Sequence, residues 1–270
     1  YSLKAAAGQH AKNIQIAEFT INNSPDYILE EIYKKKPDIL MFSCYIWNLT
    51  MIEEVLREYH KLCPQVPIWL GGPEVSFEVE TFMKEHPDLI KGYVYVNPRH
   101  ANALDVLKKG IEEQGMSGLK LWVATLCDDP LVFPIVEKMI EYNKPVLFHT
   151  FIKAVGQLRY ETTSYHIGNI AERYPEAKII MAHLGGEPYH GIRNVAKYKN
   201  VWIDHSGTLV GSNDLQHTID LVGVDRVLFG SDMPITYAGA YGQVLEAKIS
   251  EEEKQKIFWK NTAQLFGEGF

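Results

Sequence analysis

The sequence predicts an α/β protein built on a parallel sheet, either closed as a barrel or open and doubly wound. Two observations lead to this prediction. Apolar runs rich in β-branched and aromatic residues alternate with amphipathic helical stretches along the chain. Most of these runs are continuously apolar, as in strands that are buried on both faces. With 270 residues, of which 46% are hydrophobic, the chain can bury a full core.

Nine runs are predicted to be strands, and five stretches between them are predicted to be helices because their apolar residues recur at i, i+3 and i+4. The strands are Ile14–Ile21, Asp38–Tyr45, Pro67–Leu70, Gly92–Asn97, Gly118–Trp122, Pro145–Thr150, Lys178–Leu184, Val201–His205 and Arg226–Ser231. The helices are Tyr27–Lys35, Met51–Leu62, Ala101–Gln114, Val132–Tyr142 and Thr163–Tyr174. The polar stretch Lys84–Lys91 is the best candidate for a seam between domains.

Charge and composition narrow the possible partners. The formal net charge of -7 and the dispersed lysines and arginines provide no basic surface for phosphate backbones, so we do not expect nucleic acid as a partner. No apolar run approaches the roughly 18 to 20 residues of a membrane-spanning helix, and the start of the sequence lacks the features of a signal peptide. We therefore expect a cytoplasmic protein without a membrane partner.

Polar residues follow several predicted strands, at the point where each strand ends. In a (β/α) barrel these ends converge on one face, where the loops form the active site. The residues are Asn97, Arg99, Lys120, His149, His183, Asp204, His205 and Asp232. Imidazole and carboxylate groups suit a divalent cation such as Zn²⁺, which activates a bound water. We expect a small-molecule substrate here, with Lys120, His205 and Arg99 as candidates for binding it.

Three of these strand ends carry longer motifs, which are Val146-Leu-Phe-His149, Met181-Ala-His183-Leu-Gly-Gly186 and Phe229-Gly-Ser-Asp232-Met-Pro234. Together they resemble the fifth, sixth and eighth strand-end motifs of metal-dependent amidohydrolases of the carboxymuconate-semialdehyde decarboxylase group. The resemblance covers residues 88–270 and implies a TIM barrel. It further implies that His149 and Asp232 bind the metal, that Asp232 is also the general base, and that His183 orients or polarises the substrate.

The sequence departs from that family at the first strand, which in the family ends in His-x-His and supplies two more metal ligands. None of the ten histidines forms such a pair here. Losing two of four protein ligands weakens metal binding severely. The expected function is a metal-dependent amidohydrolase-type hydrolase, or a nonoxidative decarboxylase, of a small carboxylated substrate, with impaired activity.

The first ninety residues carry a different set of motifs, in the segments Ile16–Pro25, Ile39–Asn48 and Trp69–Ser76. They resemble the flavodoxin-like cobalamin-binding domain that precedes a radical SAM domain. By this resemblance the loops after the strands cover the corrin through Ser43, Tyr45, Trp47, Gly71, Gly72 and Glu74. No Cys-x-x-x-Cys-x-x-Cys motif follows, so no iron–sulfur cluster is expected.

The two resemblances together predict a (β/α)8-like TIM barrel whose N-terminal strands are supplied by a flavodoxin-like fragment. The fragment spans residues 1–87 and the barrel segment residues 88–270, and we expect them to pack as one barrel-like domain because both use βαβ units. Nine strands would leave one surplus strand, and an incompletely closed barrel would favour homo-oligomers. Two alternatives stay open: a recombined or engineered chimeric scaffold without activity, and a cobalamin-binding module.

Overall fold

The computed structural model describes residues 12–20, 22–43, 48–66, 68–71, 91–207, 211, 213–232 and 237–267. The chain divides into two compact units, residues 1–91 and 92–270, and the described strands form one parallel sheet in each. This confirms the predicted α/β fold class. The domain division predicted between residues 87 and 88 falls outside the described residues and stays a prediction.

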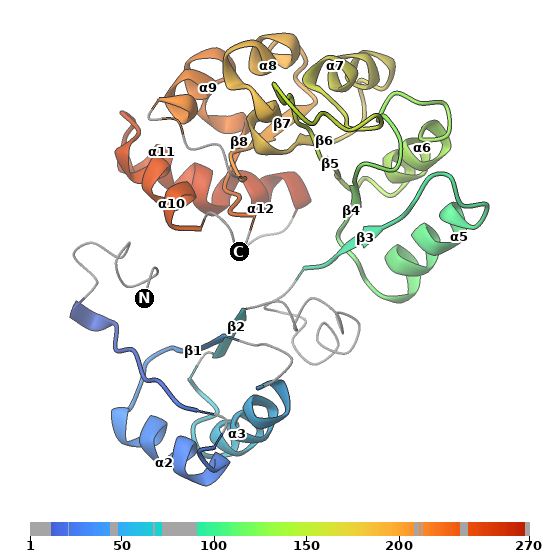
Figure 1. The fold of residues 1–270 in the computed structure, drawn as a ribbon. Coiled ribbons are helices and arrows are strands. Elements are labelled where there is room, and N and C mark those ends of the chain that lie inside the picture. Colours follow the sequence, from blue (N-terminus) through green and yellow to red (C-terminus); the bar gives the residue numbers. More distant parts are fainter. Residues whose placement is uncertain are drawn as a thin grey trace. The chain divides into compact units, whose positions relative to one another are not determined.

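The first unit alternates helices and strands, as predicted. Its elements are α2 (Pro25–Lys35), β1 (Leu40–Ser43), α3 (Leu49–Leu62) and β2 (Ile68–Gly71) (Figure 1). Helix α2 begins after Ser24, whose hydroxyl accepts a hydrogen bond from the backbone N–H of Tyr27, and Pro25 occupies the first turn. Strands β1 and β2 pair in parallel. The core of this unit is Ile28, Ile32, Val55 and Tyr59.

The strand predicted at Ile14–Ile21 is wrong for residues 14–20, which form no strand. Ile16 is 38% exposed there. The segment ends in a turn in which the backbone N–H of Thr20 donates to Asn23 Oδ1 at 2.7 Å and the N–H of Asn23 donates to the Thr20 carbonyl at 3.0 Å. An apolar run becomes a strand only where a partner strand satisfies its backbone groups. The described part of the chain thus contains eight strands instead of the expected nine.

The second unit is a six-stranded parallel sheet in sequential order, β3-β4-β5-β6-β7-β8. The strands are β3 (Tyr93–Tyr95), β4 (Gly118–Leu121), β5 (Val146–Phe148), β6 (Ile179–Met181), β7 (Val201–Asp204) and β8 (Val227–Leu228). The α-helices are α5 (Ala103–Lys108), α6 (Phe133–Glu141), α7 (Ser164–Arg173), α8 (Pro188–Val195), α9 (Asp214–Val222), α10 (Tyr237–Glu246), α11 (Glu251–Gln255) and α12 (Asn261–Phe266). Each strand pairs with the next one along the chain, as consecutive strands of a (β/α) barrel do.

The shorter helices of the second unit are the 3-10 helices His183–Gly186 and Val224–Arg226 and the π-helices Lys109–Glu113 and Lys256–Lys260. The helix predicted at Ala101–Gln114 is therefore divided, because α5 continues directly as a π-helix. The other four predicted helices agree with α2, α3, α6 and α7 to within a few residues.

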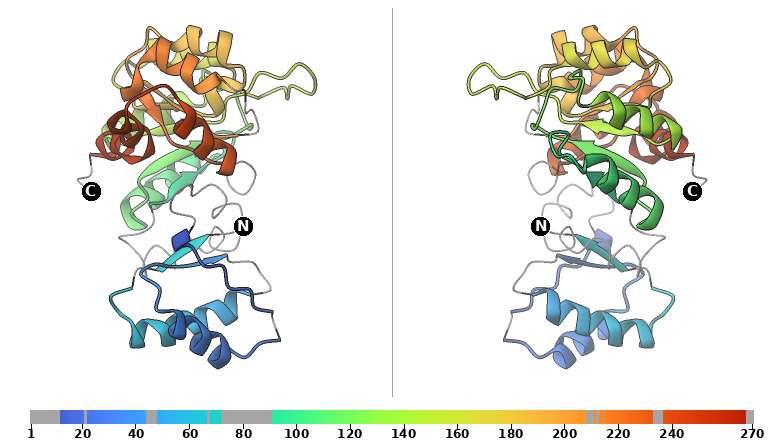
Figure 2. Two further views of the ribbon diagram at one scale, coloured as in Figure 1. Left: turned by 90° about the vertical axis from the view of Figure 1, so that its left-hand side faces the viewer. Right: turned by 90° about the vertical axis from the view of Figure 1, so that its right-hand side faces the viewer.

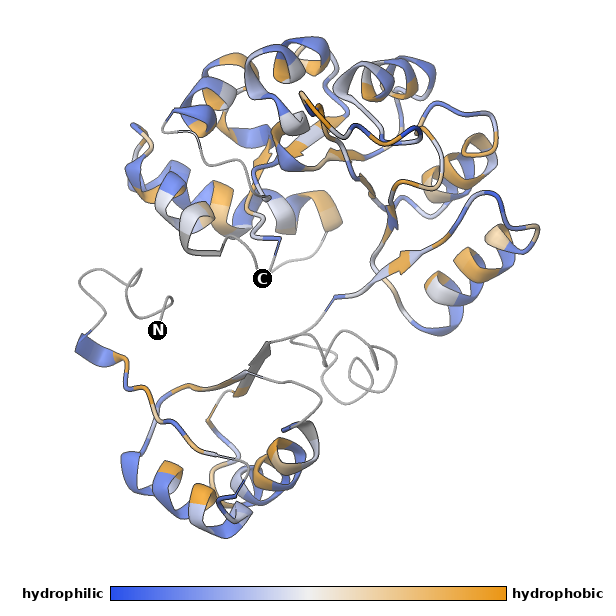
Figure 3. Cartoon of the chain, in the orientation of Figure 1, coloured by the Kyte–Doolittle hydropathy of each residue, from blue (hydrophilic) through white to orange (hydrophobic). Residues whose placement is uncertain are grey.

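The strands carry the core of the second unit. Leu119, Phe148, Ile179, Met181 and Ile203 are all buried, as expected for strands covered on both faces. Helices α6, α7, α8 and α9 lie on the outer side of these strands (Figure 1). Hydrophobic residues mark the strands and the inward helix faces, while hydrophilic residues face outward (Figure 3). This arrangement leaves the carboxyl ends of the strands, with their loops, as the natural place for a site.

One connection stands apart from the rest. The loop between β5 and α7 projects from the unit and is drawn in yellow-green in Figure 2. Val155, within this loop, is 89% exposed.

Among the described residues, no helix combines the length and the apolar composition that crossing a membrane requires.

Candidate functional site

His149 and His183 are neighbours because of the sheet. His149 directly follows β5 and His183 comes two residues after β6. These strands are hydrogen-bonded partners, with Phe148 opposite Met181. Parallel strands place their carboxyl ends at the same edge, so both imidazoles reach the same point above the sheet.

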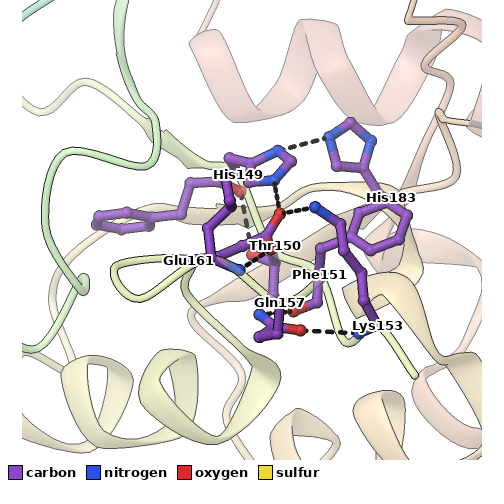
Figure 4. Close-up of polar contacts among 9 residues, drawn as sticks. His149, Thr150, Phe151, Lys153, Gln157, Glu161 and His183 are labelled. Carbon is purple, nitrogen blue, oxygen red and sulfur yellow. Dashed lines mark hydrogen bonds and ion pairs between the residues drawn. The ribbon is translucent and has the colours of Figure 1, made fainter. Parts of the chain in front are cut away.

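The two imidazoles are in direct contact (Figure 4). His149 Nδ1 lies 3.2 Å from His183 Nε2. On its other side, His149 Nε2 lies 2.9 Å from Oε1 of Glu161, whose side chain is 1% exposed. Burial lowers the pKa of His149, and the charges of His183 and Lys120 act in the same direction, although Glu161 opposes the shift.

The backbone of His183 and Leu184 adopts a strained, left-handed conformation. His183 has φ 61° and Leu184 has φ 51°, both in the left-handed region that costs non-glycine residues about 1–2 kcal/mol each. The N–H of His183 donates to Asp204 Oδ1 at 3.2 Å, and its Nδ1 lies 2.9 Å from Ser206 Oγ. A Cβ at Gly207 would lie 2.9 Å from His183 Nδ1, so the ring fits against a backbone without a side chain. Strain held in place by such contacts is typical of functional sites.

Aromatic rings and one lysine surround the pair. The Phe151 ring stacks on His149 with an interplanar angle of 15°, and the Trp122 ring meets His149 edge-on with ring centroids 6.2 Å apart. Trp122 is 55% exposed and can therefore contact a ligand. Burial lowers the pKa of Lys120, while the negative charges of Asp204 and Asp232 oppose that shift. Lys120 thus shares the electrostatic environment of this strand-end face.

Asp232 and His205 are two further predicted site residues. Asp232 is exposed, has φ 49°, and acts on Lys120 through its charge. His205 is buried, and its Nδ1 lies 3.2 Å from Gln243 Oε1. Its other nitrogen, Nε2, has no hydrogen-bond partner among the described residues, and burial lowers the pKa of the ring. The metal and base roles of Asp232 and the substrate role of His205 stay predictions.

Arg99 lies among the loops that follow the strands. Its Nε donates to the carbonyl of Ala124 at 2.7 Å, and its guanidinium stands 4.3 Å from the centroid of the Tyr160 ring. Ala124 follows β4 and Tyr160 lies in the loop after β5. The arginine is therefore held between two loops of the strand-end face, and its substrate-binding role stays a prediction.

The donor set can be tested directly against a metal ion. A separation of 3.2 Å between two imidazole nitrogens suits two ligands on one ion. Within the residues that the structure describes, however, no group of three or more His, Cys, Asp or Glu side chains is arranged to hold a metal. The described residues therefore do not form a complete site for the divalent metal that the motifs imply.

The predicted cofactor residues of the first unit are described only in part. Ser43 and Gly71 are Cα partners at the carboxyl ends of β1 and β2, so these two strand ends lie side by side. The Ser43 carbonyl accepts a hydrogen bond from Asn48 Nδ2 at 3.0 Å. The remaining predicted residues, Tyr45, Trp47, Gly72 and Glu74, lie outside the described residues.

Sequence reasoning missed two residues whose side chains lie within hydrogen-bond distance of the two imidazole rings. Glu161 lies twelve positions beyond His149 in the loop before α7, and no motif distinguishes it from its neighbours. Ser206 directly follows the Asp204-His205 pair. The one available signal for Ser206 was its place just beyond a predicted strand end.

Two family models match the chain. The model described as amidohydrolase matches residues 79–267, and the model described as B12 binding domain matches residues 1–107. No curated protein matches the chain. The two matched ranges overlap at residues 79–107.

Solved structures show the same fold over most of the chain. A dihydroxybenzoic acid decarboxylase from a Polaromonas species, with bound manganese and the inhibitor 2-nitroresorcinol, is 17% identical, with a TM-score of 0.57 over 85% of this chain and 96% of that chain. The 2,6-dihydroxybenzoate decarboxylase from Rhizobium is 15% identical, with a TM-score of 0.58 over 85% and 98%. A protein described as amidohydrolase II is 17% identical, with a TM-score of 0.58 over 99% and 96%. These likenesses show that the fold is the amidohydrolase-type barrel fold.

Proposed function

Because this chain belongs to the amidohydrolase family, we propose that its second unit binds a small aromatic carboxylate and catalyses nonoxidative decarboxylation or hydrolysis at reduced efficiency. The observation that carries the proposal is the contact between His149 and His183 at the carboxyl ends of β5 and β6. Two imidazoles at adjacent strand ends of a barrel form a site for general acid–base chemistry.

The surroundings of the pair support the aromatic carboxylate as ligand. Trp122 and Phe151 offer ring faces and edges against which an aromatic ligand can pack. Lys120 provides an amine on the same face, and an ammonium group there would bind a carboxylate through charge-assisted hydrogen bonds. Two of the similar structures are decarboxylases of dihydroxybenzoates, which are small molecules of this class.

We assign the chemical roles to the chain's own residues. His183, held by Ser206 and Asp204, orients the substrate and polarises the reacting group. Asp232 is the proposed base, and its exposure leaves it free to approach a bound ligand. Arg99 and His205 are the proposed outer contacts to the substrate.

The proposal includes a divalent metal ion. Similar structures carry manganese, and we propose zinc as the ion for this chain because imidazole and carboxylate ligands suit it, with His149 and Asp232 as the ligands. Since the described residues lack a complete donor set, the proposed activity is below that of a complete site.

Substrate binding gives the first test. Lys120→Met is expected to weaken 2,6-dihydroxybenzoate binding about tenfold or more, because a hydrogen bond to a charged group is worth roughly 1.5–3 kcal/mol. The measurement is calorimetric titration with and without added Zn²⁺ or Mn²⁺, together with CO₂ release from the same samples. Lys178→Met is the matched control, because burial also lowers the pKa of Lys178 but its ammonium binds the carbonyls of Asn143 and Leu265 at the opposite ends of the strands. Equal affinity in both variants would contradict the proposed site.

A second candidate function is cobalamin binding by the first unit. The B12 binding domain match and the side-by-side strand ends at Ser43 and Gly71 favour it. We expect the protein to retain cobalamin after mixing and desalting, detected by the visible absorption of the corrin. A spectrum identical to that of the untreated protein would exclude this function.

A further inference from the structure

His149 contacts the carboxylate of Glu161 on the side of its ring that faces away from His183 (Figure 4). The Glu161 side chain is 1% exposed and His149 is 15% exposed, so neither group is well hydrated. A buried carboxylate that accepts a ring N–H fixes both the tautomer and the orientation of the imidazole.

Glu161 lies against two groups that can only donate. Lys153 Nζ lies 2.6 Å from Oε1 and the N–H of Leu158 donates to Oε2 at 3.1 Å, so each carboxylate oxygen already accepts a hydrogen bond. His149 Nε2 lies 2.9 Å from the same Oε1. A carboxylate that pairs with an ammonium group in this way is ionised. An ionised carboxylate has no proton to donate. The proton between Glu161 and His149 therefore sits on His149 Nε2.

The same reasoning assigns the proton on His183. The Ser206 hydroxyl donates to Asp204 Oδ1, so its oxygen is free to accept from His183 Nδ1 at 2.9 Å. With its proton on Nδ1, a neutral His183 carries a lone pair on Nε2. His149, with its proton on Nε2, carries its lone pair on Nδ1. These two nitrogens face each other at 3.2 Å.

From this arrangement we infer that Glu161 is a positioning residue, which holds the proton of His149 on Nε2 and turns Nδ1 of His149 toward Nε2 of His183. The pair then presents two acceptors at one point of the strand-end face. A phenolic hydroxyl of an aromatic carboxylate is a donor that such a point can bind. This last step rests on the proposed function, whereas the orientation of His149 does not.

The test is the tautomer of His149 in the ¹⁵N-histidine spectrum of the full chain, recorded above the ordinary pKa of histidine. The parent protein is expected to show His149 protonated on Nε2. Glu161→Leu is expected to reduce that population, because leucine has no atom that can accept the ring N–H. On activity, the same variant is expected to lose about 10- to 100-fold in kcat, the usual cost of removing such a partner, with KM nearly unchanged.

Two further variants separate positioning from general structural support. Lys153→Gln removes the ion pair but leaves the carboxylate on His149, so the tautomer is expected to stay as in the parent. Glu137→Gln removes a comparable carboxylate that accepts from the Tyr174 hydroxyl at 2.7 Å between α6 and α7, and should change neither readout. If Glu161→Leu does not fold, the double variant with Lys153→Met leaves no unpaired charge and carries the same prediction.

The outcomes distinguish this inference from the proposed function. An unchanged His149 tautomer in a folded Glu161→Leu variant overturns the positioning role. A parent protein that releases no CO₂ from 2,6-dihydroxybenzoate, yet shows the expected tautomer change, contradicts the proposed reaction and leaves the positioning role standing.

Discussion

Gly186→Ala is expected to lower the free energy of unfolding of the second unit by about 2 to 5 kcal/mol, from left-handed strain and overpacking together. Gly186 has φ 76° and is buried. A Cβ there would lie 2.4 Å from the backbone nitrogen of Ile152 and 2.5 Å from Cα of Phe151. Since both neighbours are backbone atoms, the loop after β5 must move as a whole. Denaturant unfolding followed by circular dichroism measures the loss.

Gly156→Ala is the matched control for this prediction. Gly156 has φ 77°, almost the same as Gly186, but no atom would lie within 4 Å of its Cβ. It therefore tests left-handed strain without a clash, and the expected cost is only about 1 kcal/mol. The Gly186 variant should also disturb the ring of His149, because Phe151 stacks on it. Equal destabilisation of the two variants would show that the close approach of the backbones is not what requires glycine at position 186.

Asp204→Ala is expected to destabilise the second unit by about 3 kcal/mol or more, because it leaves buried donors without an acceptor. Asp204 is 8% exposed. Its Oδ1 accepts hydrogen bonds from the N–H of His183, the N–H of Ser206 and the Ser206 hydroxyl. All three donors belong to the segments that hold the His183 ring. Thermal and denaturant unfolding measure the stability, and the ¹⁵N-histidine spectrum reports the environment of His183.

Asp204→Asn separates the loss of charge from the loss of the acceptor. The amide oxygen of asparagine can still accept from His183 and Ser206, so this variant should retain most of the stability that alanine loses. If alanine and asparagine are equally destabilising, the negative charge and not the hydrogen-bond network is what the fold requires. If neither variant is destabilised, the network contributes nothing measurable.

Much of the second unit could be predicted from sequence because its signals are local. The apolar run around Phe148 and the imidazole after it are adjacent in the chain, and so are the run around Met181 and His183. Strand periodicity and the position of a polar residue at a strand end need no knowledge of distant residues. The failure at residues 14–20 shows the limit of this reasoning, because an apolar run cannot report whether a partner strand is present.

The partners of the histidines depend on distant contacts. Glu161 reaches His149 only because the loop after β5 folds back, with Leu158 and Lys153 on the same carboxylate. No pattern in the local sequence predicts that this loop folds back toward His149. Asp204 and His205 are adjacent in sequence, yet Asp204 contacts His183 while His205 contacts Gln243 of α10. Neighbouring side chains at a strand end point to opposite sides, so two residues that are adjacent in sequence have different partners here.

The sequence by itself determined the parallel α/β architecture, the position of most strands and helices, and the placement of His149 and His183 at strand ends, because these follow from short-range periodicity and chain direction. The tertiary structure alone decided that the two imidazoles meet at 3.2 Å, that Glu161 and Ser206 orient them, and that Gly186 must lack a side chain. Hydrogen bonds and close packing act between atoms that are near in space, and the chain brings residues such as Phe151 and Gly186 together only when it folds.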